Sequence, residues 1–217
     1  CLVKGFKVVF DSSVQPNGSG IHMGYYAKGC KVLNNIIYNA TNGMVITEGN
    51  VKNNLIVKAS FAIVCGVFDE TRQYTINIDS NFITYFTYAI YPREVGLMTI
   101  NASNNIFKIE TIFQSDGEVL YNALSNSITP KFDNNVSKST NDLIFSRAIA
   151  NFVPGNFTNN QFLAKFETVF SNSSSSATFK NNNVLNSQNA YNGVGDVRYN
   201  NFWNVGNYPQ DTTNISV

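Results

Sequence analysis

Short hydrophobic stretches alternate along this chain with asparagines, and the alternation recurs at a nearly regular interval. Eight times an apolar run meets an Asn, usually a doubled one, and apolar residues resume after it. The last Asn of each site lies at position 35, 54, 81, 105, 135, 160, 183 or 201, so the steps between sites are 19, 27, 24, 30, 25, 23 and 18 residues. A period near two dozen that varies at each step is typical of a solenoid, in which coils stack and loops absorb the insertions.

Asparagine suits the corner of such a coil. It tolerates the left-handed backbone region that a tight corner needs, and its amide can bond to nearby backbone. Amides stacked about 4.8 Å apart at the same corner can also bond to one another. We therefore expect each Asn to occupy a corner between parallel strands with the next residue turned inward, so that Ile36, Ile56 and Ile106 line the core. Eight or nine coils would form a rod roughly 40 Å long at about 4.8 Å per coil.

The composition favours an all-β fold. Val, Ile, Thr, Phe and Tyr fill short runs, and no long run follows the 3.6-residue helical period. Hydrophobic residues make up 43% of the 217 residues, and charged residues only 13%. The Gly/Ser-rich stretches at 18–20 and 171–176 are each followed by the next coil at the proper distance, so they predict loops within one domain that spans 1–217. An uncapped solenoid end would expose strand edges, so we expect the protein to continue beyond both ends or to be covered there by partners.

Charge and cysteine content exclude several classes of function. The formal net charge of +1, with scattered basic residues, argues against a nucleic-acid partner. No apolar run is long enough to predict membrane insertion. The three cysteines, Cys1, Cys30 and Cys65, show no CxxC spacing, so they predict neither a zinc site nor a disulfide framework. We expect them to be small buried core residues.

Four segments together resemble a known repeat: Gly20-Ile21-His22-Met23, residues 30–37, Gly43-Met44-Val45-Ile46 and residues 51–56. Their pattern resembles the right-handed parallel β-helix repeat of the pectate-lyase-like superfamily. The tail at 199–208 and 214–217 is similar to an element that recurs in large exported bacterial β-helix proteins. The resemblance implies a right-handed, single-stranded parallel β-helix with an Asn ladder. It also implies part of a larger exported bacterial or phage protein, located outside the cell or on its surface.

The resemblance supplies a register for the third strand of each coil, whose sheet borders the carbohydrate groove in that superfamily. It implies an inward row of Ile21, Met44, Ile63, Ile90, Ile112 and Ile144. The next position faces outward and holds His22, Val45, Val64, Tyr91, Phe113 and Phe145. Two positions further on lie Gly24, Thr47, Gly66, Arg93, Ser115 and Arg147. Because Phe lacks a polar group for sugar contacts, we expect Phe113 and Phe145 to pack against protein.

This register does not assemble a familiar catalytic centre. A calcium-dependent lyase needs several carboxylates on adjacent coils together with an Arg or Lys base, and a hydrolase needs two or three carboxylates at about 5 to 10 Å. The nearby carboxylates, Glu48, Asp69, Glu70, Glu94 and Asp116, fall one or two per coil without an aligned pair. Neither a metal site nor a cofactor is therefore predicted. Calcium is compatible with the superfamily, but no ligand set here points to it.

Two hypotheses for function remain. In the first, the chain is a scaffold or adhesin-type region of a surface protein that contacts a glycan, with further coils, domains or a partner subunit packed against it. In the second, it is part of a polysaccharide lyase or glycoside hydrolase whose groove runs near His22, Tyr91 and Arg93. The candidate carbohydrate-binding residues are Tyr91, Arg93, His22, Tyr25 and Glu94. The candidate catalytic residues are His22, Glu48 and Arg93. The missing carboxylate cluster favours the scaffold.

Overall fold

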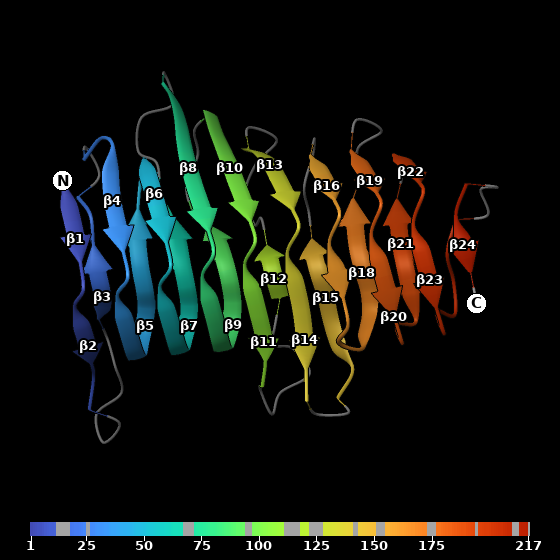
Figure 1. The fold of residues 1–217 in the computed structure, drawn as a ribbon, viewed down its shortest axis with the longest axis horizontal. Coiled ribbons are helices and arrows are strands. Elements are labelled where there is room, and N and C mark those ends of the chain that lie inside the picture. The colour runs from blue at the N-terminus through green and yellow to red at the C-terminus, as the bar shows by residue number, and fades with distance from the viewer. Residues whose placement is uncertain are drawn as a thin grey trace.

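The computed structural model shows strands stacked side by side along a rod, from β1 at one end to β24 at the other (Figure 1). It describes residues 1–11, 18–24, 27–66, 72–93, 97–110, 118–121, 128–140, 143–150, 155–172, 177–193, 195–209 and 213–216. These residues form 24 strands, and no helix occurs among them. Accordingly, no helix in this part of the chain is long and apolar enough to cross a membrane. The strand pairs are parallel throughout, so the chain is an all-β parallel β-helix, as the sequence predicts.

One face of the rod is a nine-stranded parallel sheet, which we call the first face. Each coil contributes one strand, and every strand after β1 ends just before a corner that carries an Asn rung, whereas β1 ends before Gly5. Nine strands agree with the predicted eight or nine coils. The strands, in spatial order, are β1 (Leu2–Lys4), β4 (Cys30–Leu33), β6 (Gly49–Lys52), β8 (Gln73–Asp79), β10 (Leu97–Ser103), β13 (Ile128–Asp133), β16 (Asn156–Thr158), β19 (Thr178–Lys180) and β22 (Asp196–Arg198).

The other fifteen strands form a second sheet that has two arms. The arm directly after the Asn corner, which we call the second face, contains β2 (Lys7–Val9), β11 (Ile106–Ile109), β14 (Val136–Ser139), β17 (Gln161–Phe162), β20 (Asn183–Leu185), β23 (Asn201–Trp203) and β24 (Ile215–Ser216). The following arm, which we call the third face, contains β3 (Ser19–His22), β12 (Glu118–Tyr121), β15 (Phe145–Ala150), β18 (Phe166–Asn172) and β21 (Asn189–Gly193).

Three long strands run through both arms: β5 (Ile36–Ile46), β7 (Leu55–Cys65) and β9 (Phe82–Pro92). Each bends at a residue in the left-handed region, namely Asn39, Lys58 and Tyr85, whose φ angles are 58°, 58° and 54°. Left-handed Lys and Tyr are uncommon, and their conformation is maintained by the strand pairing on both sides. The bend turns the chain from the second face to the third without an intervening loop.

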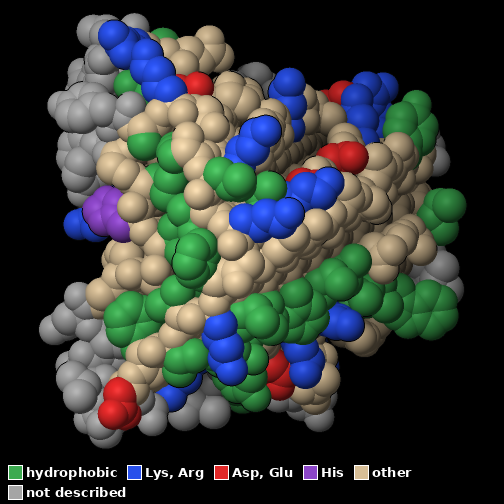
Figure 2. Space-filling model, turned by 60° about the vertical axis from the view of Figure 1, so that its left-hand side comes forward, with side chains coloured by type: hydrophobic (Ala, Val, Ile, Leu, Met, Phe, Trp, Pro, Cys, Tyr) green, Lys and Arg blue, Asp and Glu red, His purple; other side chains and the backbone are tan. Residues whose placement is uncertain are grey.

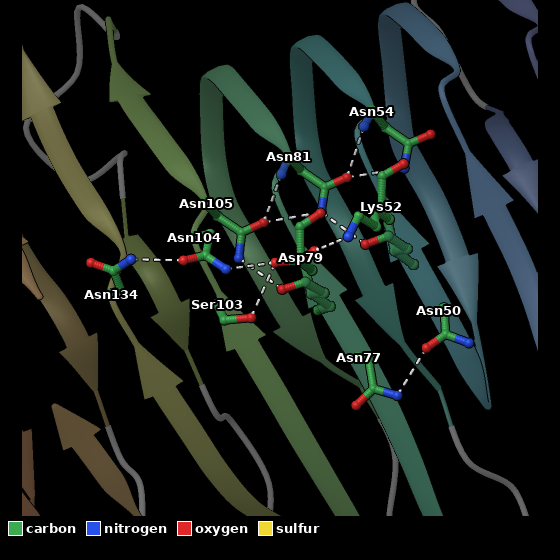
Figure 3. Close-up of polar contacts among 12 residues, drawn as sticks. Asn50, Lys52, Asn54, Asn77, Asp79, Asn81, Ser103, Asn104, Asn105 and Asn134 are labelled. Atoms are coloured by element: carbon green, nitrogen blue, oxygen red, sulfur yellow. Dashed lines mark hydrogen bonds and ion pairs between the residues drawn. The ribbon is translucent and has the colours of Figure 1, made fainter. Parts of the chain in front are cut away.

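A buried asparagine ladder joins the first face to the second (Figure 3). Each rung donates both its backbone N–H and its side-chain amide to the Oδ1 atom of the next rung, as Asn81 does to Asn105 at 2.9 and 3.0 Å. The same side chain also donates to a carbonyl of the first face, such as Val51 O for Asn81 at 3.0 Å. The rungs are Asn35, Asn54, Asn81, Asn105, Asn135, Asn160, Asn182, Asn200 and Asn214.

The ladder corrects the predicted corner by one residue. The left-handed corner residue precedes the rung, as Asn34 and Asn53 do, and the rung itself is buried. The residue after the rung therefore points outward, and the second residue after it points inward. Consequently Ile56 lines the core as predicted, whereas Ile36 and Ile106 are partly exposed and their predicted inward placement is wrong.

The last coils show the same correction most clearly. In the triplet 181–183 the rung is Asn182 rather than Asn183, and at the next coil it is Asn200 rather than Asn201. A ninth rung, Asn214, lies only 14 residues further on and closes the described end of the ladder. The inward apolar residue fixes these assignments, because Val184 and Phe202 each lie two positions after a rung and are buried.

Aromatic rings fill much of the interior between the three faces. Phe107 stacks on Phe132 with ring centroids 5.8 Å apart, and Phe132 continues to Phe157 at 6.3 Å. Phe170 lies 5.3 Å from Phe179. All five rings are essentially inaccessible to solvent, and Phe pairs of this kind contribute about 0.5–1.5 kcal/mol beyond area burial. The core therefore becomes more aromatic toward the C-terminal coils.

The cysteines differ from the prediction. Cys1 and Cys30 form a disulfide that ties the start of the chain to β4, because parallel pairing of β1 with β4 brings residues 29 apart in sequence together. Sequence spacing alone does not show this proximity. Cys65 is a free, buried thiol, as expected for a small core residue, and burial raises its pKa to about 12.

Polar side chains outside the ladder also connect successive coils to one another at the same corner. The Asp79 carboxylate lies 2.7 Å from Lys52 Nζ and accepts a 2.8 Å hydrogen bond from Asn104, whose amide in turn accepts from Asn134 (Figure 3). Partial burial alone would raise the pKa of Asp79, but the hydrogen bonds from Lys52 and Asn104 and the Lys52 charge lower it below its ordinary value. These contacts keep successive corners in register.

Candidate functional site

The third face carries the residues predicted to form a binding groove. Its pairing places Ile21, Met44, Ile63 and Ile90 in one inward row, as expected, because their Cα atoms are register partners. The row continues with Leu120 and Ile149, then Phe170 and Tyr191, in the later coils.

The predicted continuation of that row through Ile112 and Ile144 is wrong for Ile144, which is partly exposed. Phe145, expected to face outward against another protein, is fully buried and contacts Phe166 with ring centroids 6.2 Å apart. The predicted register fails here because β5, β7 and β9 each run through both arms, whereas β11 and β12, and likewise β14 and β15, are separate strands. Ile112, Phe113 and Ser115 lie outside the described residues.

Three outward rings form a cluster on β7 and β9, which we call the aromatic platform: Phe61, Tyr88 and Tyr91. Phe61 stacks on Tyr88 with centroids 5.4 Å apart and an interplanar angle of 16°. It also contacts Tyr91 at 4.7 Å, and the two tyrosines lie 5.4 Å from each other. Residues 61 and 88 are register partners, and the Tyr91 ring contacts both of their rings because regular alternation is interrupted at the two consecutive buried residues Ala89 and Ile90.

An open groove of about 280 Å³ runs beside this platform. Its walls combine rings, small polar groups and one cation, and we call it the third-face groove. It is lined by Thr41, Asn42, Phe61, Val64, Tyr91 and Arg93. The Arg93 side chain is exposed, and its backbone N–H is anchored to Cys65 O at 2.9 Å. Aromatic rings next to a cation and an amide group can hold a polar, ring-shaped ligand.

The structure brings only some of the predicted site residues together. Tyr91 and Arg93 both line the groove. His22 is exposed and lies in the same row as Tyr91, but Val45 and Val64 separate them. Three strand spacings place His22 about 14 Å from Tyr91.

Glu48 lies in the turn between β5 and β6, at the end of the third face. It is partly exposed, and its backbone carbonyl accepts a bond from the Cys30 N–H at 3.2 Å. Glu48 does not line the groove with Arg93. Tyr25 and Glu94, the other two candidates, lie outside the described residues, as do Asp69, Glu70 and Asp116.

Two charged residues that the sequence did not single out for this site continue the Tyr88 row. Glu118 is the register partner of Tyr88, and Arg147 lies in the same row one strand further. Arg147 Nε is 3.5 Å from Glu118 Oε1, while the other carboxylate oxygen has no hydrogen-bond partner among the described residues. Burial raises the pKa of Glu118, and the Arg147 charge opposes that rise only in part. The register implied by the resemblance places Arg147 in the Arg93 row, and the strand pairing corrects that placement.

The described residues contain no group of three His, Cys, Asp or Glu side chains close enough together to hold a metal ion. Glu118 is paired with a cation rather than with a second carboxylate. Over this part of the chain, the third face therefore offers rings, amides and guanidinium groups. These are groups that bind a ligand by stacking and hydrogen bonding.

Comparisons with family models, with curated proteins and with solved structures give no match. The fold assignment therefore rests on the parallel register of the two sheets and on the asparagine ladder.

Proposed function

We propose that this chain is a rigid rod of an exported or cell-surface protein that binds a polysaccharide along the third-face groove without cleaving it. The observation that carries the proposal is the aromatic platform beside Arg93. Its rings come from adjacent strands, so their spacing follows the coil repeat, and a chain of sugar rings can lie across them. The β-helix itself supplies rigidity, because the buried ladder and strand pairing fix the groove before a ligand arrives.

Two further features support this proposal. The chain resembles the pectate-lyase-like superfamily, in which the corresponding sheet borders a carbohydrate groove. The Cys1–Cys30 disulfide favours an oxidising compartment, since disulfides persist mainly in exported and surface proteins. Binding without cleavage fits the described groove, whose lining contains one cation and no carboxylate.

The test is a titration of the protein with oligosaccharides of alginate, pectate and chondroitin, followed by calorimetry. Tyr91→Ala and Arg93→Ala should each weaken binding by about tenfold or more, which corresponds to about 1.4 kcal/mol. Trp203→Ala is the matched control, because Trp203 is an exposed ring on β23, outside the groove. Equal loss in the control, or full affinity in both groove variants, would contradict the proposed site.

The same samples test for cleavage. They are incubated with and without calcium while the absorbance of unsaturated uronate products and the number of reducing ends are followed. No turnover is expected. Turnover that disappears in Arg93→Ala would replace the scaffold proposal with the lyase alternative, in which Arg93 is the base.

A further inference from the structure

The second face bears an apolar row on its outside, where a solenoid surface is normally polar. Five register partners on consecutive coils form this row, and we call it the outer stripe: Ile36, Leu55, Phe82, Ile106 and Val136. All five side chains are partly exposed. Figure 2 shows hydrophobic side chains gathered in a band along the rod, with lysines or arginines beside it.

The fold does not require these side chains to be apolar. In the next coils the same row holds Gln161, Asn183 and Asn201, all exposed. The strand pairing is unchanged across this switch. The contiguous apolar run therefore covers five coils, and the row is apolar again only at Ile215, after three polar coils. A contiguous, partly exposed apolar row of this kind is a candidate interaction surface.

Lysines lie at one end of the outer stripe and on its side away from the Asn corner, while the corner side carries Lys52, Asp79 and Asp133. Lys7 continues the row at one end, Lys58 lies three positions after Leu55, and Lys108 and Lys138 lie two positions after Ile106 and Val136. Glu110 is the one carboxylate described at 7–9, 36–39, 55–58, 82–85, 106–110 and 136–140, and it pairs with Lys108 at 3.1 Å. Four lysines minus one glutamate give these segments a charge of +3, although the whole chain carries only +1.

This combination selects the kind of partner. A second copy of the chain would bring two lysine-rimmed surfaces together, and like charges across an interface oppose association. A lipid bilayer is also a poor fit, because the stripe side chains are only partly exposed and therefore present little surface for insertion among acyl chains. An acidic protein segment with one apolar side can pack its apolar side chains on the stripe and pair its carboxylates with the neighbouring lysines.

The dimensions suit a helix. Five strands at about 4.8 Å spacing give a stripe about 19 Å long. A helix rises about 5.4 Å per turn, so 13 or 14 residues span the stripe and place about four apolar side chains along it, one per turn. We propose that the outer stripe docks an acidic amphipathic helix of a partner protein, laid along the rod, with its carboxylates facing Lys58 and Lys138. This proposal does not depend on the third-face groove.

The experiment uses two synthetic, fluorescein-labelled 14-residue peptides that share Leu at helical spacing. One carries Glu on the flanks and the other carries Lys. Fluorescence anisotropy should show saturable binding of the Glu peptide, weakened by salt, and no binding of the Lys peptide. Failure of the Glu peptide to bind would overturn the proposal. Association with phosphatidylglycerol vesicles or self-association in sedimentation, in place of peptide binding, would overturn it as well.

Substitutions locate the binding surface. Ile106→Gln copies the residue that Gln161 already places in this row, so the fold tolerates it, and it should weaken peptide binding about tenfold. Lys138→Glu should weaken it similarly through charge and leaves the apolar row intact. Leu97→Ala, which removes an exposed apolar side chain on β10 of the first face, is the control and should bind normally. If folded Ile106→Gln and Lys138→Glu, checked by circular dichroism, both kept wild-type affinity, the stripe would not be the docking site.

Discussion

Replacing one rung of the asparagine ladder should destabilise the protein far more than replacing the neighbouring corner residue. The Asn54 side chain makes five buried or partly buried hydrogen bonds. It donates to Val32 O, Lys52 O and Asn81 Oδ1 at 2.9, 3.0 and 2.9 Å. Its Oδ1 accepts from the backbone and side-chain amides of Asn35 at 2.9 and 3.0 Å.

In Asn54→Ala the buried Asn35 N–H loses its acceptor, and two carbonyls each lose a donor. An orphaned buried group costs about 1–3 kcal/mol and a lost neutral bond about 1 kcal/mol, so the sum is about 3–5 kcal/mol. For a protein of this size that corresponds to a fall in Tm of about 6–20 °C.

The matched control is Asn53→Gly. Asn53 is exposed and has a φ of 55°, which glycine adopts without strain. The free energy of unfolding of Asn53→Gly should therefore stay within about 0.5 kcal/mol of the wild-type value. Both variants are melted in parallel by far-ultraviolet circular dichroism and unfolded in urea. If Asn54→Ala were no less stable than Asn53→Gly, the ladder would not be the buried network described here.

Two further changes test the core and the third face. Ser137 occupies an inward row position beside Phe107 and Phe162, and its hydroxyl has no hydrogen-bond partner among the described residues. Ser137→Val should therefore raise the free energy of unfolding in urea by about 1 kcal/mol. A lower free energy of unfolding would show that the hydroxyl has a hydrogen-bond partner. Burial raises the pKa of Glu118, so its contribution to folding is fully present below the ordinary Glu pKa and is lost as the pH rises through the raised value. Glu118→Gln should therefore be more stable than the wild type at pH 7, and this advantage should vanish near about pH 4 in pH-dependent melts; an unchanged difference across that range would contradict the buried carboxyl.

Sequence alone predicted the architecture because the ladder is a local signal repeated many times. An Asn with apolar residues on both sides, repeated about every two dozen residues, meets the requirements of the corner, the strands and the core of a β-helix at once. Few other folds require this pattern. The register implied by the resemblance predicted the inward row from Ile21 to Ile90, and the strand pairing confirms this row because the coils up to β9 preserve one register. Tyr91 and Arg93, two of the candidate site residues, both line the third-face groove.

The tertiary structure decided the side-chain placements that depend on pairing between coils, because pairing determines which residues lie opposite one another. Side chains alternate along a strand, so a one-residue error at the corner reversed the placement of Ile36 and Ile106. From β11 onward the second-face and third-face strands are separate, and the later rows differ from the predicted ones: Phe145 is buried and Arg147 lies beside Glu118. The Cys1–Cys30 disulfide likewise depends on the pairing of β1 with β4, a contact between residues 29 apart that no local pattern records. The sequence thus determined the repeat and its core, while pairing between coils determined which side chains meet on the surface.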